Sequence, residues 1–581
     1  MQKIYIIKTD GLLFAAIFLA NLFHFIGLEY SPPGFYMDEA FGAVQALCIQ
    51  LSGQDFLGNP LPLFAVNAVG NVYTPPFLYG EVLWTFIFGN SVTGFRSFIG
   101  FVTSLTILFT YLFVKNRVGS KAALWVAFAG SIMPWSFIFS RIAWDPPLAT
   151  LFISMLLWSS TFKKYNWIAG VFLAFAAYSY PPMRLMAPVL LILMPGVSLR
   201  FKLINMLVAG FVCLPLAWYM LSNQDFMIRS HMMAIWSPFY GNPFRNYEID
   251  ALLKAIWINF SSHFGFNFLF LHGEHSLRSS IQTFGMLSWL DLFAYAIIPI
   301  ALIWKKFRTK DLIIFTLAEK QLIYLGIIGV ILSCIPSSLT HEGVPNAVRS
   351  LTTWLFFSLL TGMLIGKFIK EASSPFMRLG LLGLGISFFV LFLSSYFIQY
   401  PVIAKEAFQM DYFTAYSLPK VQKGNANTCK DIREYFEVSA RPEVYVGDHI
   451  SFAESFQPSS KLLWDNWYEK EAWGVWSNGK RASLHFPKRD KASSSIDLEI
   501  KGLITGKNPN QSVRVKVNGE VTSINLTSAS AQVFRIPLNN PSNKDLAIEI
   551  ETPDAKSPVQ AGFSNGDNRR LGVGLISVTF N

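Results

Sequence analysis

The sequence is poor in charged residues and in cysteine. Only 14% of its 581 residues are charged, whereas 52% are hydrophobic and 16% are aromatic, which excludes an ordinary soluble protein. Its four cysteines, Cys48, Cys213, Cys334 and Cys429, are far apart. They form neither a CxxC metal motif nor a recognisable disulfide framework, so we expect structural thiols. The composition indicates a polytopic α-helical membrane protein.

The sequence also lacks basic clusters interleaved with aromatic residues. Its net charge of +11 therefore does not indicate nucleic-acid binding. In a membrane protein such an excess reflects cytoplasmic loops rich in Lys and Arg. No His, Cys, Asp and Glu residues have the spacing of metal ligands, so we predict no cofactor and no metal site, and a divalent cation is optional.

Long apolar runs are the dominant feature of residues 1–399. A helix needs about 20 apolar residues to cross a bilayer. Applied to this chain, that length predicts about eleven spans, near residues 11–28, 94–114, 122–139, 148–162, 167–179, 186–197, 203–221, 286–304, 321–338, 350–366 and 379–398. Lys and Arg gather in every second loop, at 115–121, 163–164, 200–202, 305–310 and 367–378. The positive-inside rule therefore predicts a cytoplasmic N-terminus and an external C-terminal domain.

A pair of acidic residues follows the first predicted span. Two prolines and a glycine end that span, and apolar residues at helical spacing then follow Asp38 and Glu39. We expect this amphipathic helix, and a second one at 76–89, to lie in the membrane interface. A helix N-terminus stabilises an ionised carboxylate, which is the form a general base needs. Taken alone, a capping or first-turn role explains both acids more simply.

Ionisable and Pro-rich segments gather on the predicted external side. Besides the acidic pair they comprise the loops at 72–77, 140–147, 178–184, 222–285 and 340–349. Transporters more often place ionisable residues within their spans. Residues at span ends instead favour a reaction between a lipid-anchored reactant and a second reactant that is soluble or also lipid-anchored.

Seven segments together resemble a known family. They are PPGFYMDEA at 32–40, GNPLPLF at 58–64, TPPFLY at 74–79, FSRIAWD at 139–145, YSYPPMRL at 178–185, FLFLHGEHSLR at 268–278 and IPSSLTHEGVPNAVRSL at 335–351. Their order and spacing resemble bacterial membrane glycosyltransferases of the dolichyl-phosphate-mannose protein mannosyltransferase type, glycosyltransferase family 39. That family belongs to the GT-C fold group, with the lipid A aminoarabinose transferase. The resemblance extends to about residue 420.

The resemblance implies a GT-C fold and a membrane glycosyltransferase of the bacterial inner membrane. Such an enzyme moves one sugar from a polyprenyl (undecaprenyl) phosphate to a hydroxyl of a cell-envelope glycan, a lipid or a protein, on the periplasmic face. The resemblance also implies that Asp38 is the base or lies beside it. Two alternatives stay open: a lipid-linked sugar translocase, and a polymerase or ligase that consumes polyprenyl-pyrophosphate oligosaccharides.

The predicted external loops supply the other candidate site residues. Asp145 is a second candidate catalytic acid beside Asp38 and Glu39, although it also suits the N-cap of the next span. Many relatives carry Lys or His where this chain has Thr74, so phosphate binding would fall on arginines, which hold phosphate in bidentate fashion. A single Arg at a span end more often reaches lipid headgroups. The expected donor- and acceptor-binding residues are Tyr73, Arg141, Tyr180, Arg184, His272, Arg278, His341 and Arg349.

The composition becomes that of a soluble protein beyond residue 400. We divide the chain into a transmembrane catalytic domain at 1–399, a periplasmic connecting region at 400–470 and a periplasmic domain at 471–581. The last is an antiparallel β-sandwich, jelly-roll-like, because alternating residues predict strands at 482–486, 496–500, 513–517, 521–526, 533–538, 546–550 and 571–580. Asn518-Gly519 predicts a two-residue hairpin turn.

The connecting region has weaker patterns. A helical pattern occupies 431–438, and a strand pattern occupies 443–446. A Trp-rich connection follows, with Trp464, Trp467, Trp473 and Trp476. Trp rings stack on sugars, but Trp is also a residue of cores and membrane interfaces, and we favour the second role.

Overall fold

The computed structural model divides into two compact units, Met1–Ile432 and Arg433–Asn581. The residues that the structure describes are 2–66, 72–223, 233–237, 244, 248–309, 315–372, 375–405, 407–408, 421–422, 428–430, 432, 449–453, 462–486, 493–517, 519–538, 546–563, 567 and 569–581.

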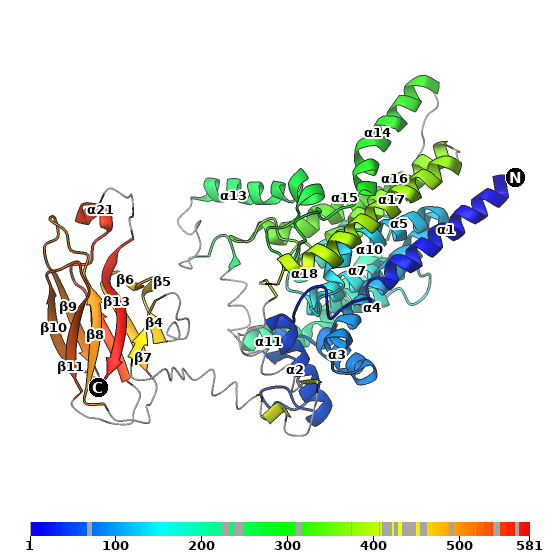
Figure 1. The fold of residues 1–581 in the computed structure, drawn as a ribbon. Coiled ribbons are helices and arrows are strands. Elements are labelled where there is room, and N and C mark those ends of the chain that lie inside the picture. Colours follow the sequence, from blue (N-terminus) through cyan, green and yellow to red (C-terminus); the bar gives the residue numbers. More distant parts are fainter. Residues whose placement is uncertain are drawn as a thin grey trace. The chain divides into compact units, whose positions relative to one another are not determined.

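The first unit is helical (Figure 1). Its α-helices are α1 (Gln2–Leu22), α2 (Met37–Ser52), α3 (Pro75–Phe88), α4 (Val92–Val118), α5 (Ser120–Ile132), α6 (Pro134–Phe139), α7 (Pro146–Ser159), α8 (Ile168–Ser179), α9 (Met183–Leu193), α10 (Leu199–Val212), α11 (Leu214–Ser222), α13 (Ile249–Ser262), α14 (Trp289–Thr309), α15 (Leu317–Ser338), α16 (Thr353–Ala372), α17 (Pro375–Ser394) and α18 (Tyr400–Ile403). The described residues of this unit also form two π-helical turns, η2 (Asn267–Leu271) and η3 (Ser395–Gln399), and the short strands β1 (Ala65–Val66) and β2 (Val72–Tyr73).

Several of these helices suit a membrane. Within the described ranges, four segments are long and apolar enough to cross one: Val92–Val118, Leu317–Ser338, Thr353–Glu371 and Phe376–Ile403. The pair α10 and α11, bent by 49°, makes a fifth if it is one span. The prediction of a helical unit with membrane-like apolar helices is confirmed. A helix lies at each predicted span, but several are short, so the count of about eleven spans stays a prediction.

Proline explains where two predicted spans are broken. Pro134 begins α6 directly after α5, and Pro215 lies in the first turn of α11. Proline has no N–H to donate to the preceding turn, so it suits the first turn of a helix and interrupts a longer one. The apolar runs at 122–139 and 203–221 therefore each form two helices.

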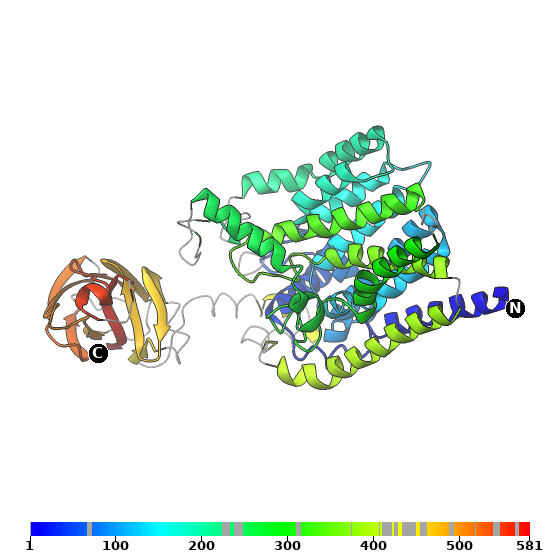
Figure 2. The same cartoon turned by 90° about the horizontal axis from the view of Figure 1, so that it is seen from above.

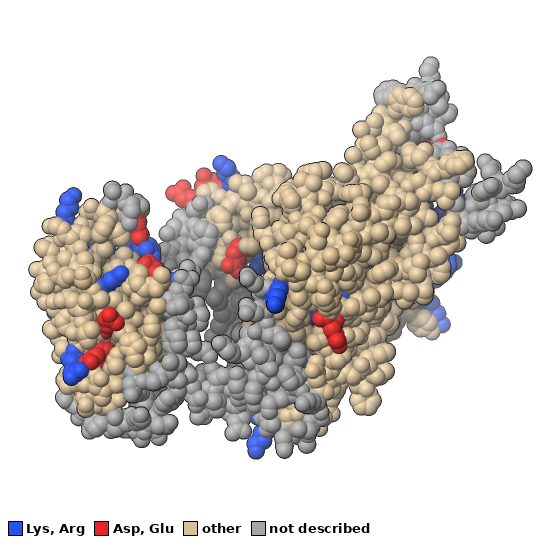
Figure 3. All heavy atoms as spheres, in the orientation of Figure 1, with Lys and Arg blue, Asp and Glu red and all other residues tan. Residues whose placement is uncertain are grey.

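Small residues let the helices approach closely. A Cβ on Gly362 of α16 would lie 2.3 Å from the backbone nitrogen of Val126 in α5, a contact that only glycine permits. Helices α1 and α17 run side by side (Figure 2). A broad uncharged surface covers the helices in Figure 3, as expected where lipid surrounds a protein.

A disulfide joins Cys48 in α2 to Cys429. The expectation of four structural thiols is therefore wrong for this pair, while Cys213 and Cys334 are free. The two bonded residues are 381 positions apart, and no spacing rule reaches that far. The bond fastens α2 to the segment at 428–430.

The described residues of the second unit form two antiparallel sheets (Figure 1). One has the order β10-β9-β12-β7-β4, and the other the order β11-β8-β13-β6-β5 with β3 paired to β13. The strands are β3 (His449–Ser451), β4 (Leu463–Asp465), β5 (Trp467–Glu471), β6 (Gly474–Asn478), β7 (Arg481–Phe486), β8 (Ser495–Lys501), β9 (Gln511–Val517), β10 (Glu520–Leu526), β11 (Gln532–Pro537), β12 (Leu546–Glu551) and β13 (Leu571–Phe580), and helix α21 spans Pro558–Ala561.

Alternating side chains hold the two sheets together. Val513, Val515 and Ile550 of one sheet share a single buried core with Leu498 and Leu575 of the other, as in a β-sandwich. The prediction of an antiparallel β-domain is confirmed, with a strand at each of the seven expected places. β9 and β10 form the expected hairpin, in which Gly519 has the positive φ of 100° that such turns require.

The connecting region departs from expectation. Its Trp-rich part forms β4, β5 and β6 of the sheets in place of a connection. Trp467 is half-buried against the common core, and Trp473 and Trp476 pack in a satellite cluster. The strand expected at 443–446, and the helix expected at 431–438 apart from Ile432, lie outside the described residues.

Candidate active site

A buried carboxylate organises the first loop of the helical unit. Glu39, in the first turn of α2, receives two charge-assisted hydrogen bonds from Arg96 of α4, each with an N–O distance of 2.8 Å. Both side chains are fully buried. The Arg96 guanidinium also donates to the backbone carbonyls of Leu28, Pro32 and Gly34. This bidentate pair fixes the start of α2 against α4.

The same carboxylate joins two loops. Glu39 accepts hydrogen bonds from the backbone N–H of Tyr36, at 3.1 Å, and from that of Ala143, at 2.9 Å. Asp38 precedes Glu39, and Asp145 lies two residues after Ala143. Asp38 and Asp145, the other two acids that the sequence singles out, are thus carried by backbone segments that the buried Glu39 side chain connects.

Asp38 lies at the start of α2, where the helix dipole favours a negative charge. Its side chain is half-buried. Its backbone carbonyl accepts a hydrogen bond of 2.9 Å from the hydroxyl of Tyr73, which is itself buried. Tyr73, expected to bind a substrate, therefore holds the backbone of Asp38 in the structure.

Contacts with aromatic rings place the loop at 274–278 beside the segments at 36–39 and 143–145. The guanidinium carbon of Arg278 lies 4.4 Å from the ring centroid of Tyr36, a cation–π geometry. The Tyr36 ring in turn lies edge-on to that of Trp144, with centroids 6.1 Å apart. Arg278 is half-buried, so a cation lies beside the segments that carry Asp38 and Asp145.

Glu274 connects its own loop, at 274–278, to the loop at 346–349. Its buried carboxylate accepts hydrogen bonds from the backbone N–H of Ala347, at 2.7 Å, and from the side chain of Asn346, at 3.3 Å. Burial raises the pKa of Glu274 to about 7, although the Ala347 hydrogen bond and the charges of Arg349 and Arg278 oppose the shift. Sequence reasoning missed this residue. The one available signal was an acid between two histidines, His272 and His275.

Two further arginines belong to these segments or interact with them. Arg349 donates to the Thr340 hydroxyl and to the Glu342 carbonyl, both at 2.8 Å, and is half-buried. Arg184, at the start of α9, donates to the Ala177 carbonyl at 3.3 Å, and its charge interacts favourably with that of Asp145. We call the assembly of Tyr36–Glu39 (residues 36–39), 143–145, 274–278 and 346–349, together with Arg184, the loop junction.

The remaining predicted residues take other places. Arg141 is fully buried, and its guanidinium donates to the carbonyls of Phe23, Ile26 and Ser31 at the end of the first helix. His272 is exposed, with its Nδ1 2.8 Å from the Gln282 carbonyl.

His341 precedes Arg349 in the sequence, and Tyr180 precedes Arg184. The backbone N–H of His341 donates to Met233 at 3.1 Å. Tyr180 is the half-buried residue that ends α8. Over the described part of the chain, no group of three or more His, Cys, Asp or Glu residues could hold a metal ion.

The loop junction combines groups of opposite charge. Carboxylates at Asp38 and Asp145 can accept a proton or stabilise positive charge, while Arg184, Arg278 and Arg349 can neutralise a phosphate. The loop junction therefore combines groups suited to acid–base chemistry with groups suited to binding an anion.

Comparison with known proteins gives distant similarities. Residues 438–581 match a family model described as a domain of unknown function, DUF7024. The archaeal oligosaccharyltransferase AglB from Archaeoglobus fulgidus, solved with an inhibitory peptide and a dolichol-phosphate, is 12% identical with a TM-score of 0.40. That alignment covers 73% of this chain and 59% of AglB, so the chain spans less than two thirds of that protein's length.

A second similar structure is ArnT from Cupriavidus metallidurans bound to undecaprenyl phosphate. It is 13% identical, with a TM-score of 0.38, and the alignment covers 74% of this chain and 76% of ArnT. No curated protein matches the sequence. With identities of 12% and 13% and TM-scores of 0.40 and 0.38, neither structure decides the fold or the activity of the chain.

Proposed function

We propose that the chain is a membrane glycosyltransferase with a GT-C arrangement of spans. It transfers one sugar from a polyprenyl phosphate to a hydroxyl of a cell-envelope glycan. The reaction takes place at the loop junction, on the periplasmic face of a bacterial inner membrane.

One observation carries this proposal: the Glu39 carboxylate bonds both to Arg96 and to the backbone of Ala143. It thereby joins the segments that bear Asp38 and Asp145, and the Tyr36 ring adds Arg278 to the same place. Sugar transfer from a lipid phosphate needs a base for the acceptor and cations for the leaving phosphate. The loop junction supplies both.

The proposed reaction uses Asp38 as the base. Asp38 accepts the proton of the acceptor hydroxyl, the hydroxyl oxygen bonds to the anomeric carbon, and the bond from that carbon to the phosphate oxygen breaks. The electron pair of that bond leaves with the polyprenyl phosphate, whose charge Arg278, Arg349 and Arg184 neutralise. Asp145 orients the acceptor or stabilises positive charge at the anomeric carbon.

Glu39 and Arg141 receive positioning roles in this proposal. Their charged groups are buried and fully engaged with Arg96 and with backbone carbonyls, respectively. Neither can reach a substrate without breaking the contacts that shape the loops. Glu39, expected among the catalytic acids, thus acts through Asp38 and Ala143.

Two observations support the location. The Cys48–Cys429 disulfide is a bond that persists in oxidising compartments and is rare in the cytosol, which favours the periplasm for α2. Helix α3 exposes Leu83, Phe86 and Ile87, which gives the first loop an apolar surface for the membrane interface and for a lipid tail.

A donor panel tests the proposal. Purified full-length protein in nanodiscs would be incubated with a membrane-glycan extract and either radiolabelled undecaprenyl-phosphate sugars or radiolabelled undecaprenyl-pyrophosphate oligosaccharides. We expect label to move to the extract from one donor, with release of undecaprenyl monophosphate in equal amount. Binding of donors without transfer would contradict the proposal in favour of a translocase. Release of a pyrophosphate from lipid-linked oligosaccharides would contradict it in favour of a polymerase or ligase.

A further inference from the structure

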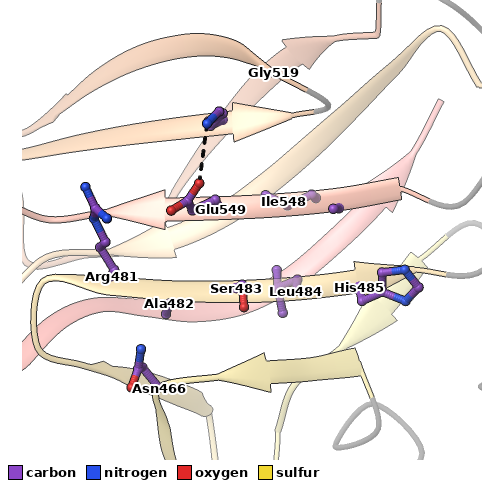
Figure 4. Close-up of a pocket in the computed structure, with 11 residues that line it drawn as sticks. Asn466, Arg481, Ala482, Ser483, Leu484, His485, Gly519, Ile548 and Glu549 are labelled. Atoms are coloured by element: carbon purple, nitrogen blue, oxygen red, sulfur yellow. Dashed lines mark ion pairs between the residues drawn. The ribbon is translucent and has the colours of Figure 1, made fainter.

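The β-sheet unit has a hollow on the outer face of its five-stranded sheet. The cavity has a volume of about 470 Å³ and opens over β7, β9 and β12 (Figure 4). This volume lies within the range of small-molecule sites. The hollow is far along the chain from the loop junction and belongs to a different unit.

Small residues create the hollow. Ala547 on β12 lies directly opposite His485 on β7, and the hairpin glycine Gly519 also borders the cavity. Both positions leave open the space that larger side chains would fill. The core beneath is closed, because Leu484 and Ile548 turn inward between the outward-facing residues.

Polar side chains from three neighbouring strands line the hollow in one row across the sheet. Lys516, Glu549 and Ser483 lie opposite one another on β9, β12 and β7. Lys516 Nζ is 3.7 Å from Glu549 Oε2, the ion pair drawn in Figure 4. Arg481 and Asn466 extend the polar wall at one end. Donors and acceptors therefore stand side by side, each within one strand spacing of the next.

The charged residues that border the hollow are paired. Lys516 pairs with Glu549, and Arg481 pairs with Glu551 at 2.8 Å. Arg514, on the same face of β9, lies opposite Glu551 as well. A polyanion would be repelled by the two carboxylates. An apolar lipid would remove water from the charged groups, which costs a large free energy of desolvation. A neutral compound rich in hydroxyls fits both constraints, since each hydroxyl donates one hydrogen bond and accepts others. Neighbouring hydroxyls on a sugar match a carboxylate and an ammonium set side by side.

We infer that this hollow binds a neutral oligosaccharide. Glu549 accepts hydrogen bonds from sugar hydroxyls, and Lys516, Arg481 and Asn466 donate to their oxygens. The unit is then a carbohydrate-binding module whose site is polar and built on the sheet, separate from the Trp473–Trp476 cluster. The inference does not require the transfer reaction, and either can fail without the other.

Calorimetry on the full chain tests this site. The protein is placed in lipid nanodiscs, because alkyl-maltoside detergents would themselves present sugars. The probes are oligosaccharides derived from dextran, mannan and galactan, with polygalacturonate and heparin as polyanions. The variants are Ala547→Phe, which fills the hollow from an exposed position, and Val533→Phe as a matched control. Val533 is 62% exposed on β11, in the other sheet.

The expected result is binding of at least one neutral oligosaccharide by the wild type. Ala547→Phe weakens that binding at least tenfold, and Val533→Phe leaves it unchanged. Glu549→Gln, which keeps the shape of the wall, weakens it as well. Absence of binding to every neutral probe, binding to the polyanions alone, or equal binding by Ala547→Phe would overturn the inference.

Discussion

The carboxylate of Glu39 and the guanidinium of Arg96 meet through two 2.8 Å contacts in a place that water does not reach. Losing one partner of a buried ion pair leaves an uncompensated charge, at a cost of about 3–5 kcal/mol. Because this pair also holds the loops, its disruption affects both stability and the geometry of the loop junction.

We therefore predict that Arg96→Met strongly lowers the thermal stability of the protein. The double variant Glu39→Leu with Arg96→Met should recover part of the loss, because it buries no unpaired charge. A double-mutant cycle built from melting curves in detergent measures the coupling. Additive effects of the two substitutions would show that the pair does not form.

Arg278 provides a test of phosphate binding. Arg278→Ala should raise the KM for the polyprenyl-phosphate donor at least tenfold and leave stability almost unchanged, because the side chain is half-buried and stacks on one ring. The matched control is Lys254→Ala on α13. A fall in kcat without a change in KM would assign Arg278 to another step.

Glu274 should make stability depend on pH. Its pKa in the folded protein is about 7, above the ordinary 4.5, so between these values the folded state keeps a proton that the unfolded state has lost. Stability then falls as pH rises through this window, by up to about 1.4 kcal/mol per pH unit, and is level above it. Comparing melting temperatures from pH 4.5 to 8 with those of Glu274→Gln isolates this contribution. Parallel curves for the two proteins would contradict the burial of this carboxylate.

The disulfide predicts how many cysteines an alkylating reagent will label. Of the four cysteines, alkylation of the denatured protein without reductant should label the two free thiols, Cys213 and Cys334. All should react after reduction, and an unreduced digest should contain a peptide joining Cys48 to Cys429. Labelling of every cysteine without reductant would refute the bond.

The parts of the fold that could be predicted from the sequence are those with a clear local pattern, either alternating residues or a long apolar run. Strands such as β8 and β9 bury every second residue, and the helices fill the apolar runs, so period and length were sufficient signals. β4, β5 and β6 were missed because they span only three to five residues each, and a run rich in Trp shows no clear alternation. Short strands owe their position to the sheet around them.

The candidate site was less accessible to sequence reasoning. Asp38 and Asp145 could be proposed from their loops, but the bond between Glu39 and Ala143 joins residues 104 positions apart. Arg96 lies at the start of a predicted span and gave no signal of its buried partner. Tertiary packing decides such contacts, as it does the Cys48–Cys429 bond. Sequence reasoning therefore found the acids without the framework that connects them.

Single-turnover sugar transfer by Asp38→Asn tests most directly whether Asp38 is the base of the proposed reaction. The variant keeps the size of the side chain and the backbone carbonyl that Tyr73 binds, so it should fold and bind donor lipid normally. The matched control is Asp250→Asn, which changes an exposed acid on α13. We predict transfer at least 100-fold slower for Asp38→Asn, in line with the contribution of a general base, and unchanged for Asp250→Asn. Transfer at the wild-type rate by Asp38→Asn would show that the loop junction does not perform the reaction with Asp38 as its base.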